Sequence, residues 1–187
     1  MDVGTGDGRL VIREAHRDPR ALVVGVDANA SAMREAARRA AAKQSRGGCP
    51  NAIFVVAAVE ALPAGMAGFA GRVTVNFPWG SLLRGCLGQE PAVLHRLAVL
   101  LDDGAELEAL VSLVDRDGLV SPSEEHLRVS YRAASLDLQE YRQATSGEIA
   151  TCRSSWARRL GAGLSRPVWR ITAVRRRQHA RAKPGGW

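Results

Sequence analysis

Three glycines alternate with other residues in the segment "DVGTGDGR", which runs from Asp2 to Arg9. Because glycine lacks a side chain, such a loop lets a ligand approach the backbone closely. A second apolar run ends at Asp27, nineteen residues after Gly8, where a carboxylate can accept both hydroxyl groups of a ribose. The spacing differs from the Gly-x-Gly-x-x-Gly of dinucleotide binders, and Asp7 would repel a pyrophosphate. A cofactor with a ribose and a positive centre is favoured, and S-adenosylmethionine has both.

The next apolar run ends in two further candidates, Val59 and Glu60. Small side chains at this position leave room for a flat adenine, and Glu60 could accept a hydrogen bond from its amine. A glutamate here is also typical of a helix start. Its place at the strand end that follows Asp27 favours cofactor binding.

A large aromatic residue stands where the fourth apolar run breaks, in Asn76-Phe77-Pro78-Trp79. The order is similar to the Asn or Asp, Pro-Pro and aromatic residue of many amino-group methyltransferases. In that chemistry the Asn side chain and a backbone carbonyl free an amine lone pair that is conjugated with the ring. A ring nitrogen such as adenine N1 has an in-plane lone pair and needs only orientation. Both reactions need an aromatic against the base, so Trp79 is predicted to be a stacking surface.

Positive charge gathers toward the C-terminus. From Arg153 to Trp187 there are ten Lys and Arg residues and no acidic residue. Within this region "SSWARRLGAGLSRPVWR" combines charge with tryptophans, a composition that suits phosphates and stacked bases. A solvated basic tail is the alternative interpretation for the last residues.

These candidates follow a regular alternation of strand-like and helix-like segments. Runs rich in β-branched residues occupy 21–27, 52–60, 71–77, 105–115, 136–141 and 167–176, and helical patterns occupy 30–43, 91–101 and 121–134. A further helix is expected from near Arg9. Alternating strands and helices predict a largely parallel sheet covered on both faces, whose ligands bind beyond the carboxyl ends of the strands. The last two strands are more polar, as expected of an antiparallel edge hairpin.

Composition limits the class of protein. The chain has 187 residues, of which 46% are apolar and 24% charged, and Lys plus Arg number 26 against 19 acids. We expect one domain over 1–175 and a basic, disordered tail over 176–187. With no signal sequence and no apolar run of about 18 residues, a cytoplasmic protein without a membrane partner is expected. The three cysteines and four histidines have no metal-ligand spacing, so no metal site and reduced thiols are predicted.

Five segments together resemble one known family. The order and spacing of "DVGTGDGR", "GVD", "FVVAAVEALP", "FPWGSLL" and "SSWARRL" closely resemble the aminoglycoside-resistance methyltransferases of the Kam/Npm type, which modify N1 of adenosine-1408 in 16S rRNA. The resemblance extends to about Arg175. It implies a Rossmann-like class I S-adenosylmethionine-dependent fold, with a seven-stranded, mostly parallel sheet and an antiparallel C-terminal hairpin. Because the family has a hairpin and most of the first strand before the glycine loop, a truncated first strand is expected here.

The resemblance also assigns roles to individual residues. The cofactor S-adenosyl-L-methionine would be held by Asp2, Gly4, Asp27 and Glu60. Further candidates for the same cofactor site are Thr5, Gly6, Val59 and Asn76. Trp79 and Trp156 would sandwich an adenine flipped out of the rRNA helix, and Ser81 and Ser154 would position the rings or the base. Arg159 and Arg166 would hold the phosphate of the flipped nucleotide. Docking on the 30S subunit near helix 44 of 16S rRNA, as a monomer, would use Arg38, Arg39, Lys43 and Arg46.

The implied reaction is direct, in-line methyl transfer to adenine N1 without a covalent enzyme intermediate, which would confer resistance to kanamycin and apramycin. Asn76 departs from the family, which usually has an apolar residue there, and its role is left open. Two other functions are also compatible with the sequence. One is a methyltransferase for small molecules, which would not need the basic patch or paired tryptophans. The other is a truncated, non-catalytic homologue that binds rRNA.

Overall fold

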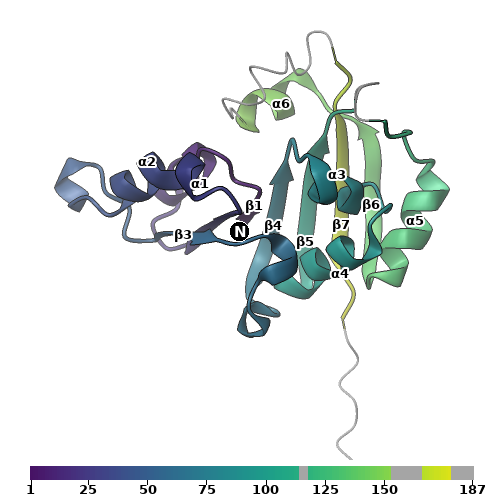
Figure 1. The fold of residues 1–187 in the computed structure, drawn as a ribbon, viewed down its shortest axis with the longest axis horizontal. Coiled ribbons are helices and arrows are strands. Elements are labelled where there is room, and N and C mark those ends of the chain that lie inside the picture. The colour runs from purple at the N-terminus through teal and green to yellow at the C-terminus, as the bar shows by residue number, and fades with distance from the viewer. Residues whose placement is uncertain (114–117, 153–165, 178–187) are drawn as a thin grey trace, which may run out of the picture.

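The computed structural model describes residues 1–113, 118–152 and 166–177, which build a central seven-stranded sheet (Figure 1). The strands follow the spatial order β3-β2-β1-β4-β5-β7-β6. Their bounds are β1 (Asp2–Val3), β2 (Val23–Asp27), β3 (Ala52–Val56), β4 (Ala70–Asn76), β5 (Leu101–Val111), β6 (Leu136–Gln143) and β7 (Trp169–Arg175).

Strands β1 to β5 pair in parallel, whereas β7 is antiparallel to both β5 and β6. The expected parallel sheet with an antiparallel C-terminal hairpin is thereby confirmed. Strand β1 has two residues and aligns with β4 at a single position, Asp2 opposite Thr74. This places the segment after β1 at the centre of the sheet, between the ends of β2 and β4.

Helices cover the sheet on both faces. Their bounds are α1 (Arg9–Arg17), α2 (Ala30–Ala40), α3 (Gly80–Cys86), α4 (Pro91–Leu100), α5 (Glu124–Ala133) and α6 (Ser146–Cys152), and short 3-10 turns are η1 (Gln44–Arg46), η2 (Val59–Ala61) and η3 (Ala64–Met66). The main core packs α3, α4 and α5 against the sheet, with Leu94, Leu97 and Tyr131 fully buried. A smaller cluster packs α1 and α2 against Phe54 of β3.

The sequence pattern placed most elements but missed others. Strand β5 begins at Leu101, earlier than the expected 105, and contains Gly104 at φ 81°. Helices α3 and α6 were not predicted, and each has only seven residues. The predicted tail, 176–187, lies outside the described residues apart from its first two positions. No helix in the described part of the chain is long and apolar enough to cross a membrane.

Candidate functional site

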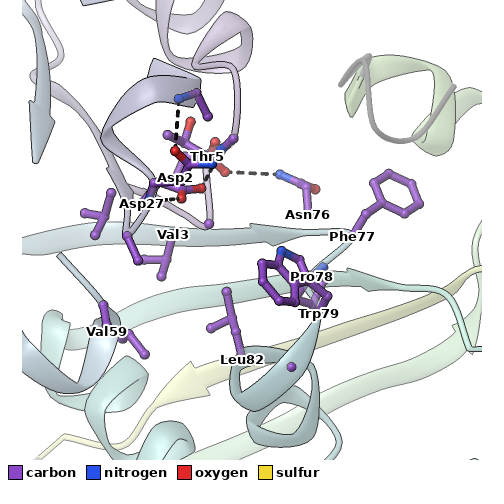
Figure 2. Close-up of a pocket in the computed structure, with 18 of the residues that line it drawn as sticks. Asp2, Val3, Thr5, Asp27, Val59, Asn76, Phe77, Pro78, Trp79 and Leu82 are labelled. Carbon is purple, nitrogen blue, oxygen red and sulfur yellow. Dashed lines mark hydrogen bonds between the residues drawn. The ribbon is translucent and has the colours of Figure 1, made fainter. Parts of the chain in front are cut away.

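A cavity of about 570 Å³ lies beyond the carboxyl ends of β1 to β4 (Figure 2). Its lining brings together all eight residues predicted to hold the cofactor, along with Trp79 and Ser81. These residues come from four separate strand ends: the glycine loop after β1, Asp27 at the end of β2, the Ala57–Glu60 segment after β3, and the turn after β4. The parallel topology therefore assembles one site from segments far apart in the sequence.

The glycine loop is shaped by backbone bonds and positive φ angles. Gly4 and Thr5 both donate their N–H groups to Val26 O, at 2.8 and 3.0 Å. Gly4 has φ 74°, and a Cβ on it would lie 2.8 Å from Leu82 Cδ2, so the loop passes close to α3. Gly8, in contrast, does not line the cavity: a Cβ there would meet Phe54 and Ala36. The expectation that all three glycines open the backbone to a ligand is wrong for Gly8, which lets α1 pack closely.

Asp27 holds the glycine loop in addition to facing the cavity. Its Oδ2 accepts a hydrogen bond from Gly6 N at 2.8 Å, and its Oδ1 accepts one from Asn29 N at 2.8 Å. Asn29 in turn caps α2 by accepting from Ser31 N and Ala32 N. Each carboxylate oxygen has a second lone pair, so Asp27 can still accept from a ligand hydroxyl.

Asp2 is a buried carboxylate on the sheet side of the cavity. Its Oδ1 accepts hydrogen bonds from Thr74 Oγ1 at 2.9 Å and from Asn76 Nδ2 at 3.3 Å. Burial raises the pKa of Asp2 above its ordinary value, and the neighbouring side chains of Thr5, Thr74 and Asn76 oppose that shift. A cation bound nearby would stabilise its charged form.

On the opposite wall, the β3 and β4 ends are linked through side chains. Ser81 Oγ donates to Glu60 Oε1 at 2.8 Å. Ser81, predicted to position a ring or the base, thus contacts Glu60, a predicted cofactor residue. Val59 is buried in η2, and Ala57 and Ala58 beside it are the small side chains that the sequence predicted.

Trp79 is presented by a strained turn. Phe77 has φ 51°, which is rare for a residue with a Cβ. Its ring is buried with Leu110 and Val168, and Pro78 follows it. The chain then exposes Trp79, whose surface is 78% accessible, directly before α3 at the rim of the cavity. The turn thus buries the ring of Phe77 in the core and exposes the ring of Trp79 to solvent.

Cys152 is a cavity residue that the sequence did not reveal. It ends α6, and its Sγ donates to Asn76 Oδ1 at 3.1 Å. The one local signal was the capping box of Thr145 and Glu148, which starts α6: Thr145 N donates to Glu148 Oε2 at 2.7 Å, and Glu148 N donates to Thr145 Oγ1 at 3.3 Å.

Several predicted positions lie away from the cavity. Arg38, Arg39, Lys43 and Arg46 are exposed around the end of α2 and η1 and do not line it. Arg38 pairs with Glu35 at 2.9 Å. Arg166 is half-buried and does not line it either. Ser154, Trp156 and Arg159 lie outside the described residues.

The cavity chemistry fits a cationic cofactor better than an anionic one. Four carboxylates, those of Asp2, Asp7, Asp27 and Glu60, line the cavity. Thr5 Oγ1 is buried close to the Asp2 carboxylate and makes no hydrogen bond of good geometry within the described residues, so a ligand could contact it. Pyrophosphate would be repelled, whereas ribose hydroxyls and a positive sulfonium match these acceptors. In the described part of the chain, no group of His, Cys, Asp and Glu side chains could hold a metal ion.

Comparison with known proteins agrees with this geometry. Residues 1–175 match the family model described as NpmA, 16S rRNA (adenine(1408)-N(1))-methyltransferase. The chain belongs to this family. A 16S rRNA (adenine(1408)-N(1))-methyltransferase of Streptoalloteichus hindustanus is 38% identical over 177 residues, covering 89% of this chain and 81% of the relative. One of Escherichia coli is 27% identical, covering 92% and 84%.

Solved structures of family members share the fold. The antibiotic-resistance methyltransferase Kmr is 38% identical with a TM-score of 0.79, over 95% of this chain and 86% of Kmr. A mutant of the Catenulisporales acidiphilia enzyme, solved with its cosubstrate S-adenosylmethionine, is 34% identical with a TM-score of 0.85, over 97% of this chain and 87% of that chain. The predicted family and the predicted methyltransferase fold are therefore confirmed.

Proposed function

We propose that this protein transfers a methyl group from S-adenosylmethionine to N1 of adenosine-1408 in 16S rRNA and so confers resistance to kanamycin and apramycin. The observation that carries the proposal is Trp79, a largely exposed indole at the rim of an acid-lined cavity, in a chain that belongs to this family. An indole exposed to solvent buries little apolar surface in the fold, but it can stack on a base.

Different residues of the cavity would hold different parts of the cofactor. S-adenosylmethionine, when bound, supplies a methyl group on a positively charged sulfur. Asp27 would accept the ribose hydroxyls while it holds the glycine loop through Gly6. Val59 and Glu60 would bind the adenine, and Asp2 would face the positively charged ammonium group of the cofactor, which S-adenosylhomocysteine also carries. The backbone of Gly4 and Gly6 would lie along it, because neither residue has a side chain that blocks the approach.

The protein's task toward the target base is orientation rather than proton transfer. Adenine N1 presents an in-plane lone pair, so no general base is needed to free it. Trp79 would stack on the flipped base from one side, and the resemblance assigns the other side to Trp156. Flipping costs a few kcal/mol, and stacking contributes about 1–3 kcal/mol per base, so two rings can offset one flip. Holding the reacting atoms in line then lowers the barrier.

The partner would be the assembled 30S subunit, approached near helix 44 by a monomer in the cytoplasm. A formal net charge of +7 favours association with rRNA phosphates. Arg38, Arg39, Lys43 and Arg46 would form one docking area, and Arg159 and Arg166 would hold the phosphate of the flipped nucleotide. One domain over 1–175 would carry all of these functions.

The test is methylation of isolated 30S subunits with labelled S-adenosylmethionine, followed by reverse transcription to map the modified base. We expect a stop at adenosine-1408, and we expect Trp79→Ala and Trp156→Ala to reduce labelling by about 10–100-fold. Phe69→Ala is the matched control, because Phe69 is also an exposed aromatic, at 52%, but does not line the cavity. Labelling at another base, or of free small molecules only, would refute the proposal.

A further inference from the structure

Asn76 lies where three elements meet. It ends β4 and donates through Nδ2 to Asp2 of β1 (Figure 2). Through Oδ1 it accepts from Cys152 of α6. A carboxylate can only accept from it, so the amide nitrogen must face Asp2 and the amide oxygen must face Cys152. Burial raises the pKa of the Cys152 thiol to about 11, which keeps it protonated and able to donate. Both ends of the amide are thus engaged.

Asp2 depends on side-chain contacts for its orientation. The bonds from Thr74 and Asn76 converge on Oδ1, and Oδ2 takes part in neither. A buried carboxylate is costly unless donors satisfy it, so these two bonds both orient the group and favour its charged form.

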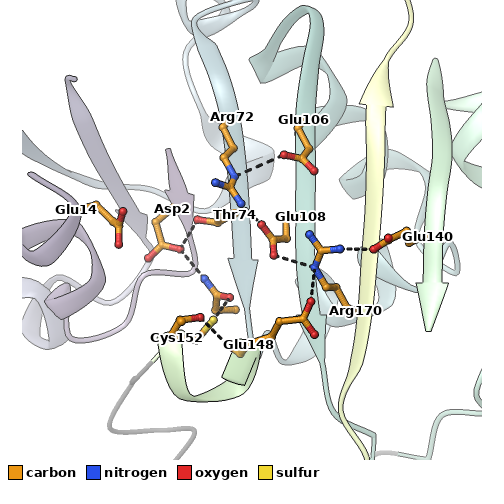
Figure 3. Close-up of polar contacts among 12 residues, drawn as sticks. Asp2, Glu14, Arg72, Thr74, Glu106, Glu108, Glu140, Glu148, Cys152 and Arg170 are labelled. Carbon is orange, nitrogen blue, oxygen red and sulfur yellow. Dashed lines mark hydrogen bonds and ion pairs between the residues drawn. The ribbon is translucent and has the colours of Figure 1, made fainter. Parts of the chain in front are cut away.

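Helix α6, which carries the Cys152 partner of Asn76, is held in place by contacts with β6 and β7. Figure 3 shows Glu148 of α6 beside Arg170 of β7. Arg142 contacts Glu148 through two hydrogen bonds, at 2.7 and 3.0 Å, and Arg170 Nε lies 3.4 Å from Glu148 Oε1. Cys152 and Ile149 of the same helix pack against the cluster that contains Phe77. Because α6 is fixed at both ends, the amide of Asn76 has a defined partner on each side.

We propose that Asn76 is a positioning residue that holds Asp2 in the orientation in which the cavity binds S-adenosylmethionine, and that it acts through Asp2 rather than through contact with the methyl group or the base. The inference rests on the cofactor part of the proposed function. Asn76 would therefore affect the affinity for the cofactor. It would have no role of the kind that Asn has in enzymes that methylate exocyclic amines.

The test is a double-mutant cycle read by calorimetric binding of S-adenosylhomocysteine. Asn76→Leu keeps the size but removes the donor, and we expect binding about tenfold weaker, as for loss of a hydrogen bond to a charged group. In an Asp2→Ala background the same change should weaken binding by less than about twofold, because its target is gone. Asp2→Val, which also lacks an acceptor, serves if Asp2→Ala does not fold. If the fold losses in affinity of the two single variants multiplied in the double variant, the proposal would be overturned, because Asn76 would then contact the ligand independently of Asp2.

Two further variants separate this role from general stability. Thr74→Val removes the other donor to Oδ1 and should resemble Asn76→Leu. Val75→Ala creates a cavity on the opposite, fully buried side of β4 and should lower the melting temperature without changing affinity for S-adenosylhomocysteine. In methylation of 30S subunits, Asn76→Leu should raise KM for S-adenosylmethionine with kcat within about twofold of the starting value.

The outcomes distinguish the inference from the proposed function. If the unaltered protein does not bind S-adenosylhomocysteine, the proposed function fails. If it binds and Asn76→Leu binds equally well, only the role of Asn76 fails.

Discussion

At the scale of single residues, the site depends on backbone conformations that few side chains permit. Gly4 and Gly6 both have positive φ, at 74° and 58°, but their surroundings differ. A Cβ on Gly4 would meet Leu82 at 2.8 Å, whereas a Cβ on Gly6 would meet nothing within 4 Å. Adding a Cβ at Gly6 therefore measures the cost of the backbone conformation alone, whereas adding one at Gly4 also measures the cost of crowding Leu82.

We predict that Gly6→Ala lowers the free energy of unfolding by about 1–2 kcal/mol, the cost of placing a Cβ in the left-handed region. Gly4→Ala should cost about 1–3 kcal/mol more, because Leu82 must also move. Urea denaturation of both variants measures the difference. Equal destabilisation of the two variants would show that Leu82 yields without cost.

At the scale of elements, α6 illustrates a short helix that is stabilised from outside. The contact with Arg142 and the bonds from Thr145 lower the pKa of Glu148 from an ordinary 4.5 to about 2. A carboxyl group with a lowered pKa contributes stability above its ordinary pKa, and this contribution disappears as the pH falls from 4.5 toward 2. Because the two side chains remain partly exposed, at 41% and 28%, solvent screens the pair and its net effect is modest.

We therefore predict that Glu148→Gln lowers the melting temperature by about 2 °C at pH 7. The difference from the unaltered protein should shrink as the pH is lowered from 5 to 3. Circular dichroism melts at several pH values measure it. Glu124→Gln on α5 is the control, since its pair with Arg128 is exposed on both sides and should contribute less. A difference that stays constant down to pH 3 would contradict the assignment.

The same scale shows what the sequence could and could not predict. Asp27 and Glu60 end strand-like runs and Trp79 stands just after one, so the topology of a parallel sheet was enough to bring them together. Cys152 meets Asn76 across 76 residues, and no local pattern encodes that contact. Helix α6 was missed because its seven residues are held by Arg142 and Arg170 rather than by their own periodicity. Gly8 was misread because its neighbour Phe54 comes from another strand.

At the scale of the whole molecule, the uneven charge distribution should decide how the protein docks. The basic positions around the end of α2 lie far from α5 in Figure 1, which places the two helices at opposite ends of the sheet. The pairs Arg38 with Arg39 and Arg128 with Arg132 are closely matched. All four are exposed, and in each pair one arginine forms an ion pair with a glutamate of its own helix.

We predict that replacing Arg38 and Arg39 by Gln weakens binding to 30S subunits and makes it less sensitive to salt. Removing one phosphate interaction should reduce the slope of log K against log salt by about 0.7–0.9, so removing two should reduce it by up to about 2. Replacing Arg128 and Arg132 by Gln removes the same charge and should leave the slope nearly unchanged. Filter binding over a salt series measures both, with binding of S-adenosylhomocysteine as the check on folding. Equal slopes for the two double variants would mean that net charge alone, rather than the face at α2, drives association, because charge removed at either end of the molecule would then count the same.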